Sequence, residues 1–498
     1  MTVDARRLVD KLWSYVHVLR DDGVGVLDYT EQLIYLLFLK MAHERATRPL
    51  KPEQVLPEQY SWQRLMDARG QELEAVYTGM LQGLSREPGV VGTIFRKAQS
   101  RIQDPAKLRR IIVDLIGAQQ WSQSGTDLNG DAYEAILARS ASDGSSGAGQ
   151  YFTPRALIEA IVDAVDPTVE DSVVDPAAGT GGFLLVAHDH ASREASSMTP
   201  TQREKLRDDF VHGYELVDAT ARLAAMNLLL HGMGRYDGES LIDVRDSLTS
   251  VPSRRWSVVL SNPPFGRKSS MTVVGDDGRE VREDREIVRQ DFVATTSNKQ
   301  LNFVQHIMTI LDVNGRAAVV LPDNVLFEGG AGEVIRRKLL TDFHLHTLLR
   351  LPTGIFYAQG VKANVIFFDK KPARPGEVWT DAMAVYDLRT NKHFTLKQSP
   401  LRRADLDEFV TGYRRPEAQV GERWRTFTYD ELIARDKANL DITWLRDETL
   451  EDMDNLPSPD VLAREIVEDL TAALAEFEAV AVSLEEQLSS ADATQEDR

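Results

Sequence analysis

Four consecutive residues, Asn262-Pro263-Pro264-Phe265, combine groups that could hold a planar amine. They follow the apolar run 258–260 after a single serine, Ser261, and that run predicts a buried strand. Two prolines fix the backbone and remove two N–H donors, so carbonyl groups stay free to accept hydrogen bonds. The Asn262 side chain adds an amide oxygen, and Phe265 adds a flat face on which a ring can stack. The motif therefore predicts a pocket for a ring with an exocyclic amine. The alternative is a rigid strand exit that binds nothing.

A glycine-rich turn earlier in the chain predicts a second binding surface. The predicted strand 172–175 ends at Asp175, and Gly179, Gly181 and Gly182 follow before a predicted helix. Glycine permits a tight turn and lets backbone N–H groups approach a ligand closely. Ligands of open α/β sheets bind at the carboxyl ends of the strands, so this turn and the Asn-Pro-Pro-Phe motif could border one crevice. A plain strand-to-helix turn is the alternative.

Two further acidic residues follow predicted strands. Glu215 closes the predicted strand 211–215, where a carboxylate can accept hydrogen bonds from ribose hydroxyls. The polar stretch 192–209 explains the long separation between Asp175 and Glu215 as an insertion. Asp246 could face an adenine ring from a third strand end, although a solvated turn acid is an equally good interpretation.

Strands and helices alternate from 150 to about 370 and must position these residues. Apolar runs predict buried strands, and amphipathic stretches between them predict helices. This alternation is typical of an α/β protein with a mainly parallel sheet covered on both faces. The predicted strands are 172–175, 211–215, 256–260, 317–321 and 364–368, and the predicted helices are 157–165, 219–230, 303–311 and 333–340.

Changes in composition divide the chain into five predicted parts. An all-helical N-terminal domain, 1–140, is followed by a Gly/Ser linker, 141–149, and by the α/β domain, 150–372. A polar α/β extension, 373–460, precedes a heptad helix, 461–498. Such a helix needs a coiled-coil or bundle partner, or packs on its own domain. Its apolar seam is Ala463, Val467, Leu470, Leu474, Phe477, Ala481, Leu484 and Leu488.

Composition excludes several classes of protein. The 498 residues include no cysteine, which excludes disulfides, thiolate metal sites and a cysteine nucleophile, and which suits a reducing cytoplasm. No signal peptide is expected, and the densest apolar run, 33–39, is far shorter than the roughly 20 residues of a membrane span. Two His-x-His pairs, 188/190 and 344/346, lack a third ligand in sequence, so no metal site is predicted.

The chain is acidic, with 58 Lys and Arg against 77 Asp and Glu and a net charge of −19. Neutralisation of phosphates dominates the affinity of proteins for bare DNA. If this protein acts on nucleic acid, a local basic groove or a partner must supply that attraction.

The strings 175–182 and 262–265 together resemble S-adenosylmethionine-dependent adenine-N6 DNA methyltransferases. Further strings narrow the resemblance to the modification (methyltransferase) subunit of type I restriction–modification systems; they occupy 149–155, 296–301, 322–330 and 351–362. The resemblance covers nearly the whole chain. It implies a Rossmann-like methyltransferase core at 150–372, with a helical N-terminal domain and a C-terminal helical tail. The implied enzyme is a site-specific adenine DNA methyltransferase, EC 2.1.1.72.

The resemblance also implies roles for single residues. The methyl donor, S-adenosylmethionine, contacts two segments, Glu215 binds its ribose, and an extruded adenine is held by Asn262, Pro263 and Phe265. The strand-end argument adds Asp175, Gly179 and Asp246 to the donor site and Pro264 to the adenine site. The two donor segments are Gln150, Tyr151, Phe152, Thr153, Pro154 and Arg155, and Thr180, Gly181 and Gly182.

The expected partners follow from the family. They are double-stranded DNA and a specificity subunit, with two methylation subunits for each specificity subunit, and a restriction/translocase subunit is optional. The specificity subunit reads the DNA sequence, which fits the acidity of this chain. We hypothesise that the helix 461–498 clasps helices of the specificity subunit. No membrane association is expected.

The target adenine must flip out of the duplex, at a cost of a few kcal/mol. Phe265 is expected to stack on one face of the ring, and Phe356 either covers the other face or belongs to the core. The Asn262 oxygen and the Pro263 carbonyl accept from the amine, which attacks the sulfonium methyl in line without a covalent enzyme intermediate. The polar segment 267–296 either closes over DNA or forms a solvated helix with i,i+4 charge pairs.

Three alternatives remain open from the sequence. The Asn-Pro-Pro-aromatic motif also occurs in enzymes that methylate a protein glutamine amide or a guanine amine of ribosomal RNA, although those chains are usually smaller. A non-catalytic scaffold would keep the fold and lose donor binding. A self-sufficient modification enzyme would need a recognition domain that 373–460 is too short to hold.

Overall fold

The structure is a computed structural model that describes residues 26–48, 52, 54, 56–102, 104–121, 153–265, 270–274, 280–284, 286–356, 361–396 and 399–446. The chain divides into two units, Met1–Thr443 and Trp444–Arg498. The elements and the site described below lie in the first unit. The predicted linker 141–149, the predicted helix 461–498 and Gln150, Tyr151 and Phe152 lie outside the described residues.

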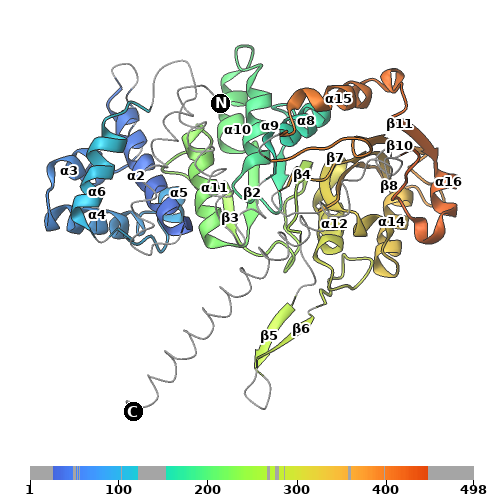
Figure 1. Ribbon diagram of the computed structural model, residues 1–498, viewed down its shortest axis with the longest axis horizontal. Coiled ribbons are helices and arrows are strands. Elements are labelled where there is room, and N and C mark those ends of the chain that lie inside the picture. The colour runs from blue at the N-terminus through green and yellow to red at the C-terminus, as the bar shows by residue number, and fades with distance from the viewer. Residues whose placement is uncertain are drawn as a thin grey trace, which may run out of the picture. The chain divides into compact units, whose positions relative to one another are not determined.

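A nine-stranded mixed sheet forms the centre of the first unit (Figure 1). Five neighbouring strands, β3, β2, β1, β4 and β7, are parallel, which fits the mainly parallel sheet predicted from the sequence, although the predicted strand 364–368 is antiparallel to its neighbours. β9 is antiparallel between β7 and β8, β10 is parallel to β8, and β11 is antiparallel to β10. In sheet order the strands are β11 (Trp424–Thr428), β10 (Ala382–Asp387), β8 (Phe343–Arg350), β9 (Ala363–Lys370), β7 (Leu311–Pro322), β4 (Trp256–Ser261), β1 (Val173–Asp175), β2 (Val211–Glu215) and β3 (Ile242–Val244).

The register of the parallel strands brings the predicted site residues together at the carboxyl ends of the strands. Val174 of β1 is paired with Val259 of β4, and Asp175 is paired with Gly213 of β2. The next residues along these strands lead directly to the glycine turn, to Glu215 and to the Asn-Pro-Pro-Phe motif. Because all three strands run in one direction, their carboxyl ends lie side by side.

Helices cover both faces of the sheet (Figure 1). The layer that contains α8, α9, α11 and α15 packs on one face, and α12 and α14 pack on the other. The helices after residue 150 are α8 (Arg155–Val165), α9 (Gly182–Ser192), α10 (Pro200–Asp208), α11 (Asp218–Leu230), α12 (Lys299–Ile310), α13 (Asn324–Phe327), α14 (Ala331–Asp342), η4 (Arg403–Leu406), α15 (Asp407–Arg414), η5 (Pro416–Ala418), α16 (Tyr429–Ala434) and η6 (Asp436–Ala438).

The described part of the chain before residue 122 contains helices and no strand. It packs on α11, where Lys97 pairs with Asp218 at 2.8 Å and Arg222 binds Glu31 and donates to the Arg96 carbonyl at 3.0 Å. Since α11 begins three residues after Glu215, these helices support one wall of the predicted site. They are α2 (Val26–Ala46), η1 (Glu58–Tyr60), α3 (Trp62–Asp67), α4 (Gln71–Leu84), α5 (Gly89–Ile94), α6 (Pro105–Arg110) and the π-helix η2 (Ile111–Gly117).

The predicted extension 373–460 contributes to the central sheet. Two of its strands, β10 and β11, complete the sheet beyond β8, and its helix α15 packs on α8. Arg350 at the end of β8 pairs with Asp387 of β10 at 3.0 Å, with both side chains buried. The five domain limits remain a prediction. The central sheet and the hydrophobic core both contain residues from before and after the predicted limit at 372.

The segment 267–296 contains an antiparallel pair, β5 (Ser270–Val274) and β6 (Glu280–Asp284). The solvated helix that we considered there is therefore wrong over 280–284. The residue types of the run Thr272-Val273-Val274 favour a strand, and its antiparallel backbone pairing with 280–284 takes the place of the helix that the i,i+4 charge spacing suggested. Among the described residues, no helix is long and apolar enough to span a bilayer.

Candidate active site

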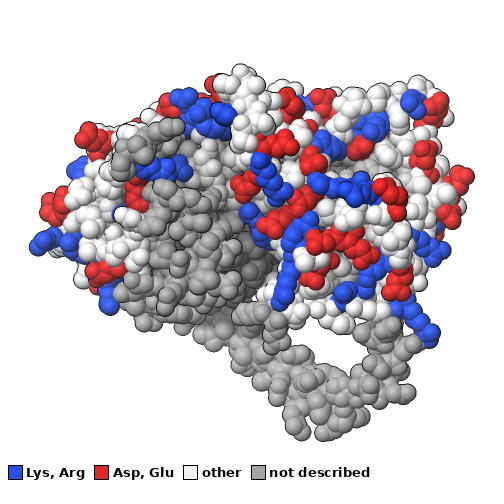
Figure 2. All heavy atoms as spheres, turned by 90° about the horizontal axis from the view of Figure 1, so that it is seen from above, with Lys and Arg blue, Asp and Glu red and all other residues white. Residues whose placement is uncertain are grey.

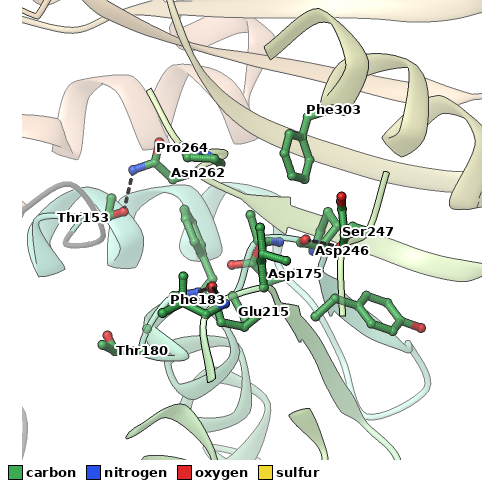
Figure 3. A pocket seen from close by; sticks show the side chains of 18 of the residues that line it. Thr153, Asp175, Thr180, Phe183, Glu215, Asp246, Ser247, Asn262, Pro264 and Phe303 are labelled. Atoms are coloured by element: carbon green, nitrogen blue, oxygen red, sulfur yellow. Dashed lines mark hydrogen bonds between the residues drawn. The ribbon is translucent and has the colours of Figure 1, made fainter. Parts of the chain in front are cut away.

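A cavity of about 390 Å³ lies at the carboxyl ends of β1, β2, β3 and β4 (Figure 3). Both predicted surfaces border it, because the glycine turn and the Asn-Pro-Pro-Phe motif lie on its wall. Pro154, Gly181 and Pro263 are described but do not line it, and 150–152 lie outside the described residues. The predicted site residues on the wall are Thr153, Arg155, Asp175, Gly179, Thr180, Gly182, Glu215, Asp246, Asn262, Pro264 and Phe265.

Asp175 joins the ends of two strands at the bottom of the cavity. Its Oδ1 accepts hydrogen bonds from the Ser261 hydroxyl of β4 at 2.7 Å and from the Ala177 N–H at 2.9 Å. Only 2% of Asp175 is exposed. Burial, with a contribution from the nearby Glu215 carboxylate, raises the pKa of Asp175 to about 7. Through its hydrogen bonds to Ser261 and Ala177, Asp175 ties the start of the glycine turn to the strand that leads into the Asn-Pro-Pro-Phe motif.

The raised pKa of Asp175 predicts a pH effect on stability. Its ordinary pKa is 3.8, so this contribution to folding is complete below about pH 4 and is lost as the pH rises through 7. We expect the free energy of unfolding to fall by about 1 kcal/mol per pH unit between pH 5 and 7 relative to Asp175→Asn. Urea unfolding of both proteins at pH 5, 6 and 7 measures the difference, and parallel pH profiles would contradict the assignment.

Glu215 holds the glycine turn against the start of α11. Its Oε2 accepts from the Gly179 N–H at 3.0 Å, and its Oε1 accepts from the Val217 N–H at 2.8 Å. Burial raises the pKa of Glu215, and the backbone hydrogen bonds oppose that shift. Each carboxylate oxygen can accept a second hydrogen bond, so the predicted contacts with ribose hydroxyls remain possible.

The glycine turn requires backbone conformations that other residues rarely adopt. Gly179 has φ of 55° and Gly181 has φ of 84°, both in the left-handed region. The turn is also held by Asn227 of α11, which lines the cavity and whose Nδ2 donates to the Thr180 carbonyl at 3.1 Å. Helix α9 begins at Gly182 on the cavity wall, so its first N–H groups can face a bound ligand.

Asn262 follows the last residue of β4 and has one free acceptor. Its Nδ2 donates to the Thr153 hydroxyl at 2.8 Å (Figure 3). Its Oδ1 is buried and has no hydrogen-bond partner among the described residues. The neighbouring Pro264 carbonyl already accepts from Gln300 Nε2 at 3.1 Å. An unpaired buried acceptor on the wall of a cavity is suited to a ligand that donates.

Phe265 lines the cavity, whereas Phe356 lies behind it. The two rings pack edge to face with centroids 5.5 Å apart and an interplanar angle of 80°. Phe356 is 6% exposed and does not border the cavity. Of the two interpretations of Phe356, the structure favours the core residue, which here supports the ring of Phe265.

Several wall residues were not identified from the sequence. Lys299 and Phe303 come from one face of α12, and Phe303 lies on the opposite side of the pocket from Glu215 (Figure 3). Leu248 lines the wall next to Asp246, whose Oδ1 accepts its N–H at 2.9 Å. The i,i+4 spacing of Lys299 and Phe303 indicates a shared helix face, but only tertiary packing decides which face meets the cavity.

The two His-x-His pairs bind carboxylates instead of forming a cluster of ligands. His190 contacts Asp163 at 3.2 Å and Asp166 at 2.6 Å, and His346 lies 3.6 Å from Asp369. Within the described ranges, no group of three His, Cys, Asp or Glu side chains is placed to hold a metal ion.

Two family models match the chain. The model described as N-6 DNA Methylase matches residues 124–450, which include the whole cavity. The model described as HsdM N-terminal domain matches residues 8–115.

Known proteins resemble the chain over nearly its full length. The methylase subunit of the type I restriction enzyme StySJI of Salmonella typhimurium strain LT2 is 38% identical over 95% of this chain and 94% of its own. The EcoKI methylase subunit of Escherichia coli K12 is also 38% identical, over the same shares. The crystal structure of the EcoKI M protein (EC 2.1.1.72) covers 96% of both chains at 34% identity with a TM-score of 0.52. A chain from a structural study of assembly and conformational transition of the type I R-M system has a TM-score of 0.69 at 26% identity, covering 96% of this chain and 98% of its own.

Proposed function

The chain belongs to the N-6 DNA methylase family, and from this membership we propose that its cavity transfers a methyl group from S-adenosylmethionine to N6 of an adenine flipped out of double-stranded DNA. We propose further that it acts as the methylation subunit of a type I restriction–modification complex. The observation that supports the proposed site is that the glycine turn and the Asn-Pro-Pro-Phe motif share one cavity.

The donor half of the cavity comprises the glycine turn, Glu215 and Asp246. Glu215 accepts from the ribose hydroxyls, and the N–H groups at the start of α9 face the polar end of the donor. Apolar side chains near Asp246, namely Leu248 and Phe303, accommodate a flat ring. When bound, S-adenosylmethionine supplies an electrophilic methyl group on a positively charged sulfur.

The target half is the Asn-Pro-Pro-Phe motif. The Asn262 Oδ1 on the cavity wall accepts one N–H group of the adenine amine, and Phe265 stacks on the ring. The second N–H group is assigned to the carbonyl of Pro263, which directly follows Asn262 but does not itself line the cavity. These hydrogen bonds keep the nitrogen lone pair available while the amine becomes tetrahedral. The new N–C bond would form as the S–CH₃ bond breaks, with the bonding electron pair left on sulfur, and the methylated amine would then release one proton to water. The rate gain comes from orientation and from fixed acceptors, without a covalent enzyme intermediate.

Sequence recognition and most of the DNA affinity are assigned to a separate specificity subunit. On the face that carries α9, α10 and α15, basic and acidic side chains are interspersed, and the described residues there form no continuous basic patch (Figure 2). The net charge of −19 also disfavours independent binding to phosphates. We assign two methylation subunits to each specificity subunit. We also propose a cytoplasmic location, where chromosomal DNA would be the substrate.

The helix predicted at 461–498 is proposed to clasp the specificity subunit. We expect deletion of 461–498 to abolish co-purification with that subunit, because the deletion removes the apolar seam on which the helices of the specificity subunit are proposed to pack. The shortened chain should still bind S-adenosylmethionine, since the cavity lies wholly in the first unit. An intact complex after the deletion would overturn this role.

The proposed function is tested with the chain co-expressed with the product of the neighbouring reading frame. Transfer of labelled methyl groups is measured on unmodified and hemimethylated duplex DNA, and on ribosomal RNA and a release factor. We expect label on N6 of adenine in DNA alone. Label on RNA or on a glutamine would support the related enzymes considered above, and no transfer with any substrate would support a scaffold.

A further inference from the structure

We propose that Thr153 is a positioning residue for methyl transfer and that its hydroxyl orients the side-chain amide of Asn262. The inference rests on the proposed function, because it concerns the same cavity. Family resemblance places Thr153 among the residues that contact the methyl donor. In this structure its hydroxyl is instead bonded to the residue proposed to hold the target amine.

The hydrogen bond to Thr153 satisfies the NH₂ group of the Asn262 side chain and leaves its oxygen available. Nδ2 donates to Thr153 Oγ1 at 2.8 Å, while Oδ1 is buried without a partner among the described residues. A side-chain amide has one NH₂ group and one oxygen. With the NH₂ group held by Thr153, the oxygen remains as the acceptor for an incoming amine. The reversed amide would present N–H to N–H and could not bind the amine.

Both partners are fixed by their surroundings. Thr153 is 8% exposed and precedes Pro154, whose carbonyl accepts from the Leu157 N–H at 2.9 Å in the first turn of α8. Asn262 follows Ser261, whose hydroxyl is bonded to Asp175 at 2.7 Å. The contact therefore joins the start of α8 to the end of β4. A bond between two fixed backbones can hold an amide plane with little loss of entropy on substrate binding.

The two possible roles of Thr153 differ in what they predict. If its hydroxyl only contacts the donor, its removal weakens donor binding and leaves the maximal rate unchanged. If it positions Asn262, its removal lowers the maximal rate and leaves donor affinity nearly unchanged. Valine is the suitable replacement, because it keeps the shape of threonine and removes the hydroxyl.

The test uses the complex with the specificity subunit, duplex DNA and labelled S-adenosylmethionine. We expect Thr153→Val to lower kcat by about 10- to 100-fold, with the Kd of the donor within about threefold of the original value. Thr153→Ser keeps a hydroxyl and should restore kcat to within about threefold. Thr341→Val is the matched control, since the Thr341 hydroxyl bonds only to carbonyls within α14 and lies outside the cavity.

The outcomes separate this inference from the proposed function. An unchanged kcat in Thr153→Val, or a loss confined to donor affinity, would overturn the positioning role while the function stands. Failure of serine to restore kcat would also overturn it. If the original complex does not methylate DNA at all, the proposed function itself fails. Thermal unfolding and donor binding of each variant establish that the fold is retained.

Discussion

Replacing Asn262 with alanine is expected to lower kcat for DNA methylation by about 1,000-fold while the affinity for S-adenosylmethionine changes by less than about threefold. The substitution removes Oδ1, the unpaired acceptor on the cavity wall, and so deprives the adenine amine of one of its two hydrogen-bond partners. An acceptor that acts mainly in the transition state affects the rate far more than the binding of a second substrate.

Single-turnover transfer and calorimetric binding of the donor measure the two quantities separately. Asn314→Gly is a suitable control, because Asn314 is exposed near the start of β7, away from the carboxyl ends of the parallel strands, and its φ of 65° suits glycine. We expect that variant to keep full activity. Normal turnover in Asn262→Ala would exclude the assigned role, and a parallel loss of donor binding would point to collapse of the site.

The meeting of Asp175, Glu215 and Asn262 at one cavity was predictable from the sequence. Each residue follows a short apolar run, and parallel strands place their carboxyl ends together, so three separate strings converge. The same reasoning identified the glycine turn, where the left-handed conformations of Gly179 and Gly181 match the need for glycine. The site was therefore predictable because the strands that precede these residues run in the same direction.

Other features depend on contacts that local patterns do not encode. The bond between Thr153 and Asn262 joins residues that are 109 positions apart, and it arises only when α8 and β4 are packed. Phe356 and Phe303 are both apolar and near the site, but packing places Phe303 on the wall and Phe356 behind Phe265. A strand with a polar outer face, such as β11, offers only a weak alternating pattern, so its addition to the sheet is visible only in the structure.

Replacing Glu215 with alanine is expected to weaken the binding of S-adenosylmethionine by about 100-fold. Two effects weaken donor binding in this variant. The proposed contacts with the ribose hydroxyls disappear, and the N–H groups of Gly179 and Val217 lose their acceptor, so the glycine turn is no longer held against α11. Glu215→Gln keeps one acceptor oxygen and should retain part of the affinity, with a loss of about tenfold.

Asp171→Ala separates the effect on the donor from a general loss of stability. Asp171 is, like Glu215, a carboxylate with several hydrogen-bond partners, since it binds Arg316 at 2.9 Å and the Ser257 hydroxyl at 2.9 Å, but it does not line the cavity. Its removal should lower the melting temperature without changing the Kd of the donor. If Glu215→Ala and Asp171→Ala lower stability alike and both bind the donor normally, Glu215 is only a structural link between the turn and α11. A selective loss of affinity in Glu215→Ala would instead mean that the carboxylate which shapes the turn also holds the ligand.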